Sequence, residues 1–464
     1  MSAPDACALA ADIRARRVSA RETVEAVLAR IGALNPTVNC FTDVLADRAR
    51  RDAAGVDARV AAGSNPGPLA GVPFAVKNLF DVAGISTLAG SRLYRERPPA
   101  VRDAAAIRAL AAAGAILVGT LNMDEFAYGF TTENSHYGPT RNPHDLTRVA
   151  GGSSGGSGAA VAAGLVPIAL GSDTNGSIRV PASFCGVFGF KPTYGRISRA
   201  GTVLFAGSFD HVGPLARSVR DLAAAFDLMQ GPDQDDPVCS ERPTSATTPE
   251  LARGLENLRI AVADGYFATG ADPEALEATA EVAGSLGVTR RVAFPEPQRA
   301  RAAAMVITAA EGSHQHLELL RTRAADFDPL TRDRFLAGAF IPAALVLRAQ
   351  RFRAWYRERV REMFQSVDVV IAPTTPCVAP FIGKTDWGRV GGFEVPVRAH
   401  LGLFTQPLSF IGLPVISMPV VRNGQLPLGV QLVGPPWSEA RLLRVASTLE
   451  ATGVVGSREP PHHA

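Results

Sequence analysis

The sequence predicts an α/β fold: one large domain in which a mixed central β-sheet is covered by helices on both faces. First, short apolar runs typical of buried strands recur along the chain. Second, helical patterns lead directly into several of these runs, which favours a partly parallel sheet. Third, no repeat, low-complexity tract or clean linker divides the 464 residues. We therefore expect a single domain, residues 1–464, whose late strands complete the sheet that the early strands begin.

The overall composition excludes several classes of protein. The chain is 47% hydrophobic and 20% charged and contains 44 glycines and 34 prolines, which is typical of a compact, loop-rich enzyme. Its net charge of +3 gives no electrostatic footprint for nucleic acid. No run approaches the roughly 20 apolar residues of a membrane span. We therefore expect neither a nucleic-acid nor a membrane partner.

The cysteines and histidines lack the spacing of metal sites. The five cysteines are scattered and include no CxxC pair, so neither a disulfide framework nor a thiolate zinc site is indicated. No HExxH motif occurs, and His314 and His316 are two positions apart, which is wrong for one helical face. The N-terminus also lacks the apolar stretch of a signal peptide. We expect a cytoplasmic enzyme without a metal.

Residues 5–62 are expected to form helices. Ser19 to Glu22 reads S-x-x-E, a capping box, and apolar residues follow at helical spacing until Pro36. Residues 45–62 carry a second helical pattern. The apolar face of the first helix either packs on the body of the enzyme or docks a partner protein.

The core, residues 67–230, is expected to begin with a strand from Gly71 to Lys77. A lysine at the end of a buried strand is costly unless it is paired or neutral. A helix follows, with Asp103 as the expected N-cap and Gly114 as the expected C-cap, and it leads into the strand AILVG.

Residues 122–143 are polar and aromatic with little periodicity, and they predict a long ordered loop of the kind that carries function. A strand is predicted at 258–263, and helices dominate from about 273 to 365, which we interpret as a helical insertion. The last of these helices is basic on one side, which we expect to face solvent. The C-terminal segment, residues 366–455, is predicted to contain three strands and a helix: 368–373, 414–420, 428–434 and a helix from Ser438.

Two glycine-rich segments, each with a serine, bracket one apolar run. The first, GGSSGGSG from Gly151 to Gly158, has enough glycine for positive φ and for close approach of backbone N–H groups to a ligand. A flexible linker would not continue directly into the pattern AAVAAGLVPIAL, and a phosphate loop would carry the GxxxxGK[ST] lysine. The second, GSDTNGSIR, places Ser177 just beyond a buried strand, where catalytic residues of α/β folds commonly lie.

A serine nucleophile needs a base, and the sequence offers no obvious histidine for that role. A lysine can serve if burial lowers its pKa toward neutrality, and Lys77 has that environment.

These segments resemble the amidase signature family. GGSSGGSGAAVAAG followed by GSDTNGSIRVPASFCGVFGFKPT is similar to the family signature, and GVPFAVKN, NMDEFAYGF and TRNPHDL extend the similarity over most of the chain. The resemblance implies a single amidase-signature domain. It implies that Ser177 is the nucleophile, that Ser153, on a cis peptide bond, is the bridging serine, and that Lys77 is the ultimate base. It implies no metal or cofactor.

Further roles are expected around the nucleophile. Asp173 and Arg179 are expected to brace the loop, and Cys185 to be a buried packing residue rather than a nucleophile. The oxyanion hole is expected to consist of four consecutive backbone N–H groups, those of Thr174, Asn175, Gly176 and Ser177.

Asn175, Met123 and Tyr128 are the expected substrate contacts. Asn175 stands where most of the family has glycine, and asparagine tolerates the left-handed region better than other residues with a side chain, so the turn can form. The NGSIR variant closely resembles family members that release ammonia from a small, nitrogen-rich, carboxylated amide. An anionic substrate requires a positive group, for which the helical insertion offers four candidates: Arg321, Arg323, Arg332 and Arg334.

Three other functions are open at this point: the glutamine-hydrolysing component of a tRNA amidotransferase (its A subunit), a general aliphatic or aryl amidase, and an inactive scaffold. The intact set of Lys77, Ser153 and Ser177 disfavours the scaffold, and Asn175 disfavours the amidotransferase component. The resemblance implies a small-molecule amide substrate. It also implies a short helical accessory subunit similar to the C subunit of tRNA amidotransferases, in a homodimer or a heterotetramer.

Overall fold

Strands from both halves of the chain form one eleven-stranded sheet in the computed structural model, which describes residues 5–461. The late strand β16 pairs with the early strand β9, so the C-terminal strands complete the sheet as predicted. The sheet is mixed, because β2 is parallel to β3 and β8, whereas β10 is antiparallel to β8. In order across the sheet the strands are β1 (Phe41–Val44), β3 (Ile116–Leu121), β2 (Pro73–Lys77), β8 (Ile168–Asp173), β10 (His211–Ala216), β9 (Phe188–Lys191), β16 (Val415–Pro419), β17 (Gly429–Val433), β13 (Val369–Pro373), β11 (Ile260–Ala263) and β12 (Arg291–Val292).

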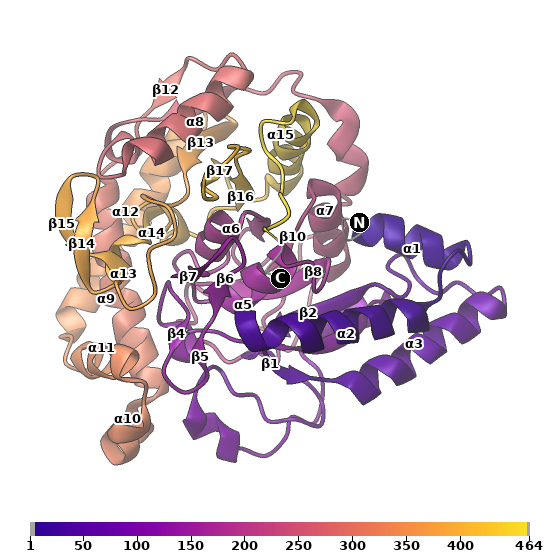
Figure 1. Cartoon of the computed structure of the whole chain (residues 1–464). Coiled ribbons are helices and arrows are strands. Elements are labelled where there is room, and N and C mark those ends of the chain that lie inside the picture. The colour runs from indigo at the N-terminus through magenta and orange to yellow at the C-terminus, as the bar shows by residue number, and fades with distance from the viewer. Residues whose placement is uncertain (1–4, 462–464) are drawn as a thin grey trace.

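Helices cover both faces of this sheet (Figure 1). Phe74 and Val76 of β2 join the hydrophobic core of one face, whereas Ala75 joins the core of the other, as the two-residue period of a strand requires. The first face is covered by α1 (Ala6–Arg14), α4 (Ala105–Ala112), α7 (Val219–Met229), α8 (Pro273–Ser285) and α15 (Glu439–Thr452). The second face is covered by α2 (Ala20–Val38), α3 (Ala46–Ala61), α5 (Gly155–Ala162), α6 (Arg179–Cys185), α9 (Pro297–Gln315), α12 (Ala343–Met363) and α14 (Gln406–Ser409).

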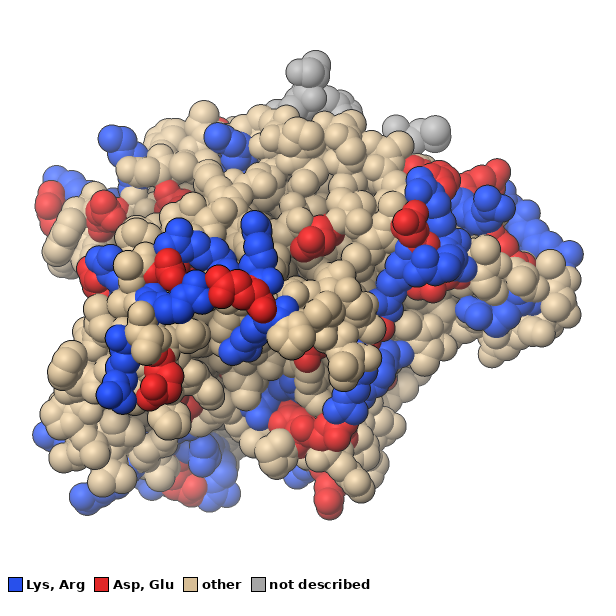
Figure 2. Space-filling model, turned by 90° about the horizontal axis from the view of Figure 1, so that it is seen from below, with Lys and Arg blue, Asp and Glu red and all other residues tan. Residues whose placement is uncertain are grey.

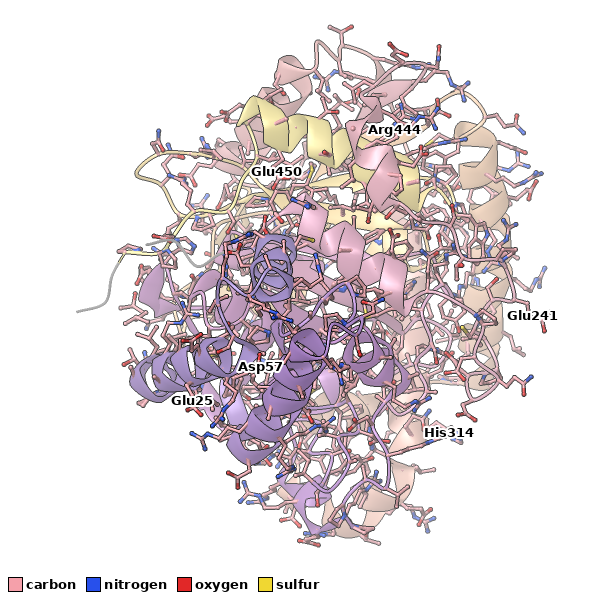
Figure 3. All side chains as sticks on the ribbon, turned by 90° about the vertical axis from the view of Figure 1, so that its right-hand side faces the viewer. Glu25, Asp57, Glu241, His314, Arg444 and Glu450 are labelled. Atoms are coloured by element: carbon pink, nitrogen blue, oxygen red, sulfur yellow. The ribbon has the colours of Figure 1, made fainter. Side chains whose placement is uncertain are left out.

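Helices α2 and α3 are joined by capping interactions. Ser19 and Glu22 form the predicted capping box at the start of α2. Asp57 of α3, labelled in Figure 3, accepts hydrogen bonds from the backbone N–H groups of Ala20 and Arg21. These bonds satisfy N–H groups that a helix start leaves without partners, and they fix α2 against α3.

Helix α2 continues past Pro36 and ends at Val38, so the predicted end at Pro36 is wrong. The proline lies in the last turn, where its missing N–H removes a single hydrogen bond of the helix. The Asn35 side chain accepts hydrogen bonds from two backbone N–H groups beyond the helix, and Asn39 leaves the helix in the left-handed region at φ 54°.

The predicted N-cap of α4 is also wrong. Ala104 occupies that position, and Asp103 instead accepts hydrogen bonds from the Arg48 guanidinium and the backbone N–H of Ala83. A guanidinium is the stronger partner for a carboxylate, and it is supplied by α3, which the local sequence does not show. Gly114 follows α4 at φ 90°, as expected of a glycine that ends a helix.

The region predicted as a helical insertion also contributes to the sheet, because α8 connects β11 to its parallel neighbour β12. Its other helices include α10 (Leu317–Arg323) and α11 (Pro329–Ala339). Figure 1 shows α9, α11 and α12 on the side of the molecule opposite to α1 and α3. Beside them lie α13 (Val397–His400) and a hairpin that was not predicted, formed by β14 (Trp387–Val390) and β15 (Phe393–Pro396).

The segment 122–143 is ordered, as predicted, and contains parts of two short hairpins. One pairs β4 (Glu133–Asn134) with β5 (Gly138–Pro139), and the other pairs β6 (Arg141–Asn142) with β7 (Asp145–Val149).

Basic and acidic side chains are interspersed on the face shown in Figure 2. Within residues 5–461, no single helix combines the length and apolar character needed to cross a membrane, although α11 and α12, bent by 95° at the break between them, pass the criteria of length and composition as a pair.

Candidate active site

The predicted base and the predicted bridging serine are in direct contact. Lys77, the last residue of β2, is fully buried, and its Nζ donates hydrogen bonds to Ser153 Oγ at 2.6 Å and to Ser172 Oγ at 2.8 Å. Ser172 lies on β8, which pairs with β2, so the sheet itself holds the lysine between the two serines. The sequence does not single out Ser172, because its role depends on the pairing of these strands.

Burial lowers the pKa of Lys77 to about 7. Removing an ammonium from water disfavours its charged form, while the nearby carboxylates of Asp124, Asp210 and Asp173 raise the pKa and limit the shift. Near neutral pH a large fraction of Lys77 is therefore the uncharged amine, which is the form that can accept a proton.

Ser153 follows a cis peptide bond from Gly152, as expected. Only glycine fits at position 152, since a Cβ there would lie 2.1 Å from Oδ2 of Asp124 and 2.5 Å from the backbone nitrogen of Thr131. The first serine loop therefore packs directly against the loop that carries Asp124.

Ser177 lies beside the first serine loop and faces a cavity. The backbone N–H of Ser154 donates to the carbonyl of Ser177 at 3.2 Å, which joins the two loops. Ser177 lines a cavity of about 330 Å³, and its hydroxyl forms no hydrogen bond with any residue between positions 5 and 461. The structure thus brings Lys77 and Ser153 together, whereas Ser153 and Ser177 are not hydrogen-bonded to each other. Catalytic hydrogen bonds of this kind often shorten only when the substrate binds.

A buried ion pair braces the loop between β8 and α6, as predicted. Arg179 donates to both carboxylate oxygens of Asp173 at 3.0 Å, and neither side chain is exposed. Asp173 also accepts hydrogen bonds from the backbone N–H groups of Gly176 and Ile178. Burial alone would raise the pKa of Asp173, but the charge and hydrogen bonds of Arg179 hold it below its ordinary value, so the carboxylate stays ionised.

Three of the four expected oxyanion donors are free to bind a substrate. The backbone N–H groups of Thr174, Asn175 and Ser177 form no hydrogen bond within the described part of the chain. The N–H of Gly176 already donates to Asp173 at 2.7 Å. The structure therefore disfavours Gly176 as an oxyanion donor.

Asn175 does not occupy the left-handed region, contrary to expectation; the positive φ falls on Gly176, at 137°. A Cβ on Gly176 would lie 2.3 Å from Oγ1 of Thr405, and the same hydroxyl donates to the Asn175 carbonyl at 2.6 Å. The requirement for glycine thus applies to position 176, and position 175 accepts a side chain that lines the cavity.

The cavity lies between the signature loops and the helices of the second half of the chain. Asn175 and Tyr128 line it beside Ser177, together with Thr308 of α9. Met123 does not, and its assignment as a substrate contact is wrong: its side chain is fully buried in the hydrophobic core of the first face. Met123 follows the end of β3, and its side chain packs into this core instead of reaching the cavity, where Met305 of α9 provides an apolar part of the wall.

Among the four candidate arginines, Arg334 is the one that lines the cavity. Its guanidinium lies 3.7 Å from the centroid of the Tyr128 ring, and its Nη1 donates to the Tyr128 carbonyl at 2.9 Å. The other three form ion pairs with acidic side chains outside the cavity. Arg334 is therefore the positive group that can meet an anionic substrate.

A buried glutamate that was not predicted positions the helix of Arg334. Glu125 is fully buried and accepts hydrogen bonds from the hydroxyls of Ser91 and Thr331 and from the backbone N–H of Asp328. Asp328 is the N-cap of α11, so Glu125 holds the start of this helix. The sequence gives no sign of this role, because about two hundred positions separate Glu125 from α11.

Cys185 packs as predicted: it is buried, and its thiol donates to the carbonyl of Ala150. Between residues 5 and 461, no group of three or more His, Cys, Asp or Glu side chains is placed to hold a metal ion.

Known proteins share both the sequence and the fold of this chain. The chain matches the Amidase family over residues 22–443. It is 54% identical to AtzE, a 1-carboxybiuret hydrolase subunit from Pseudomonas sp. (strain ADP), over 95% of this chain and 97% of that protein. It is 39% identical to the A subunit of the glutamyl-tRNA(Gln) amidotransferase from Roseiflexus sp. (strain RS-1), over 93% of each chain.

Solved structures agree with this similarity. One is described as an unexpected vestigial protein complex that reveals the evolutionary origins of an s-triazine catabolic enzyme; it aligns with a TM-score of 0.97 and 52% identity over 98% of this chain and all of that chain. A 6-aminohexanoate cyclic dimer hydrolase complexed with substrate aligns with a TM-score of 0.86 and 30% identity, over 98% of each chain.

Proposed function

Because this chain belongs to the amidase signature family, we propose that it hydrolyses a small carboxylated amide of the 1-carboxybiuret type and releases ammonia. The observation that carries the proposal is the presence, in one cavity, of the Ser177 hydroxyl and the Arg334 guanidinium. A nucleophile and a fixed positive charge in the same cavity suit an amide that also bears a carboxylate. The similarity to a 1-carboxybiuret hydrolase subunit supports the same class of substrate.

The reaction begins with a relay of two protons. Neutral Lys77 takes the proton of the Ser153 hydroxyl across their 2.6 Å contact, while Ser153 takes the proton of Ser177. The Ser177 oxygen then forms a bond to the amide carbon, and the carbonyl π electrons move onto oxygen. Ser172 accepts a hydrogen bond from Lys77 Nζ and thereby orients its lone pair toward Ser153.

The negative oxygen that develops is stabilised by the free backbone N–H groups of Thr174, Asn175 and Ser177. Such donors act without reorganisation, because the Asp173–Arg179 pair already holds their loop in shape. The C–N bond then breaks, and the proton held by Lys77 returns through Ser153 to the leaving nitrogen. Water then gives a proton to the same relay and attacks the acyl carbon; the bond from that carbon to the Ser177 oxygen breaks, the acyl group leaves as the acid, and Ser177 regains its proton.

A substrate panel tests this function. Ammonia release from 1-carboxybiuret, allophanate, biuret, glutamine and an aryl amide should show the highest kcat/KM for 1-carboxybiuret. A preference for glutamine would instead support the amidotransferase function, and a preference for the aryl amide would support a general amidase.

Replacing Arg334 with methionine should weaken binding of the substrate carboxylate without affecting the catalytic steps. We expect kcat/KM for 1-carboxybiuret to fall by about 10- to 100-fold, mostly through KM, because a charge-assisted hydrogen bond to the carboxylate is lost. Turnover of uncharged biuret should change little. The matched control is Arg332→Met on the same helix, where the arginine pairs with Asp333 outside the cavity. Equal losses in both variants, or for both substrates, would exclude Arg334 as the carboxylate-binding group.

We also propose that the chain works with a short helical accessory subunit similar to the C subunit of tRNA amidotransferases in a heterotetramer, with a homodimer of this chain as the alternative assembly. The similar curated proteins are subunits, and one similar solved structure is a protein complex. Co-expression with a short helical protein similar to the C subunit of tRNA amidotransferases should yield one complex by light scattering, with higher ammonia release than the chain alone. A chain that stays monomeric and equally active in both preparations would argue against this partner.

A further inference from the structure

Asn175 carries an unpaired acceptor at the wall of the cavity. The residue is 7% exposed and lines the cavity with Ser177, and its Oδ1 is buried without a hydrogen-bond partner among residues 5–461. Leaving a buried amide oxygen without a donor costs about as much free energy as a lost hydrogen bond, so native proteins rarely do so without a reason. The oxygen therefore lacks only a donor, which an N–H group of a molecule bound in the cavity can supply.

Thr308 of α9 decides which end of the Asn175 amide is available. The Thr308 hydroxyl donates its single proton to the carbonyl of Ala304, one turn earlier in the same helix, at 2.8 Å. Its oxygen can therefore only accept from Asn175, whose Nδ2 lies 3.4 Å away. The amide nitrogen is turned toward α9, which leaves the amide oxygen unpaired.

The backbone of Asn175 is held by a second threonine. The Thr405 hydroxyl donates to its carbonyl at 2.6 Å and contacts Gly176 so closely that no side chain fits there. Thr405 thus fixes the main chain of Asn175, and Thr308 orients its side chain. A residue that discriminates between substrates has to be held rigidly in this way.

We infer that Asn175 is a specificity-determining residue whose Oδ1 accepts a hydrogen bond from a substrate N–H on the acyl side of the cleaved bond. This inference rests on the proposed function. The leaving nitrogen must receive its proton from Ser153, so it faces Lys77 and Ser153, and the acyl part occupies the cavity with Asn175 and Thr308. The substrate class is then a ureido-type amide, R–NH–CO–NH₂, rather than a carbon-linked amide such as glutamine, R–CH₂–CO–NH₂.

Pairs of ligands that differ in one group test the inference. Biuret has an N–H group beside the cleaved carbonyl, and malonamide has a CH₂ group at the same place. Allophanate and malonamate differ in the same way, but each also carries a carboxylate. Affinities are measured by calorimetry on the Ser177→Ala enzyme, where no turnover occurs, and kcat/KM is measured on the enzyme with Ser177 intact. We expect at least about a tenfold preference for the N–H member of each pair, because CH₂ leaves the acceptor unpaired.

Three substitutions identify the group responsible. Asn175→Gly should bring the preference close to one without weakening the CH₂ ligands. Thr308→Val, which removes the acceptor for Nδ2 and lets the amide rotate, should reduce the preference, and Thr308→Ser should restore it. A purely structural role for Thr308 would lower the affinity for both members of a pair alike.

Equal affinities within each pair, or a preference that survives Asn175→Gly, would overturn the inference. The proposed function can fail separately. If the enzyme binds only biuret and malonamide, and prefers biuret, the assignment of a carboxylated substrate is wrong while the role of Asn175 stands.

Discussion

Substituting Ser177 with alanine should lower kcat/KM for every amide substrate by more than about 10⁴-fold, because removal of a covalent nucleophile eliminates the acyl-enzyme route. The fold should be retained, since the Ser177 hydroxyl makes no hydrogen bond within residues 5–461. Ammonia release measures the loss, and mass spectrometry after treatment with a fluorophosphonate should show one adduct on the original enzyme and none on the variant.

The matched control is Cys185→Ala, which removes a second nucleophilic side chain from the same signature. Cys185 is buried and hydrogen-bonded to a backbone carbonyl, so its variant should keep kcat within a few-fold and still accept the fluorophosphonate. Turnover that persists in Ser177→Ala, or disappears in Cys185→Ala with the fold intact, would show that Ser177 is not the nucleophile.

Replacing Lys77 with methionine should lower kcat/KM at least about 10²-fold and change its dependence on pH. The base must be uncharged, and its pKa is lowered to about 7, so activity of the original enzyme should rise with pH through a midpoint near 7 and level off above it. The residual activity of the variant should lack this rise. A rise near pH 7 that survives in Lys77→Met would mean that another group titrates there.

Two neighbouring residues provide the controls for this pH profile. Lys191 is also buried with a lowered pKa, but its Nζ donates to backbone carbonyls and contacts His211, so Lys191→Met should keep the rise near pH 7 in whatever fraction folds. Asp210→Asn removes a negative charge that favours the Lys77 ammonium, so the midpoint should move below 7. A midpoint that moves upward in Asp210→Asn would contradict the assignment to Lys77.

Most of the fold follows from local patterns. The predicted apolar runs do form strands, namely β2, β3, β8, β11, β13, β16 and β17, because a strand buried on both faces needs an apolar side chain at nearly every position. The central strands β9 and β10 were not predicted, since their segments FGFK and HVGPLA contain Gly, Pro, His and Lys. The edge strands β1 and β12 carry no such run and depend on their neighbours, so the sequence did not reveal them. The error at Asp103 has the same origin, since Arg48 on another helix outweighed the local signal. Helix α2 passes Pro36 for a local reason, because a proline in the last turn removes only one hydrogen bond.

The sequence alone predicts the residues that would carry out the chemistry of the site better than it predicts the residues that would select the substrate. For five residues, the type of side chain and its position in a sequence motif were enough to predict a role: Lys77, Ser153, Ser177, Asp173 and Arg179. The assignment of Met123 failed, because whether a side chain points to a cavity or into a core depends on the packing of its loop.

By itself, the sequence determined the family and the α/β architecture and predicted the reacting groups, because these depend on residue types in fixed local order. Only the tertiary structure decided that Ser172 flanks Lys77, that Glu125 holds the helix of Arg334, and that Thr308 accepts from the Asn175 amide nitrogen and leaves the amide oxygen unpaired within residues 5–461. Each of these is a contact between residues distant in the chain, and its energy comes from burial and hydrogen bonding that exist only when the sheet and the helices of the second half pack together.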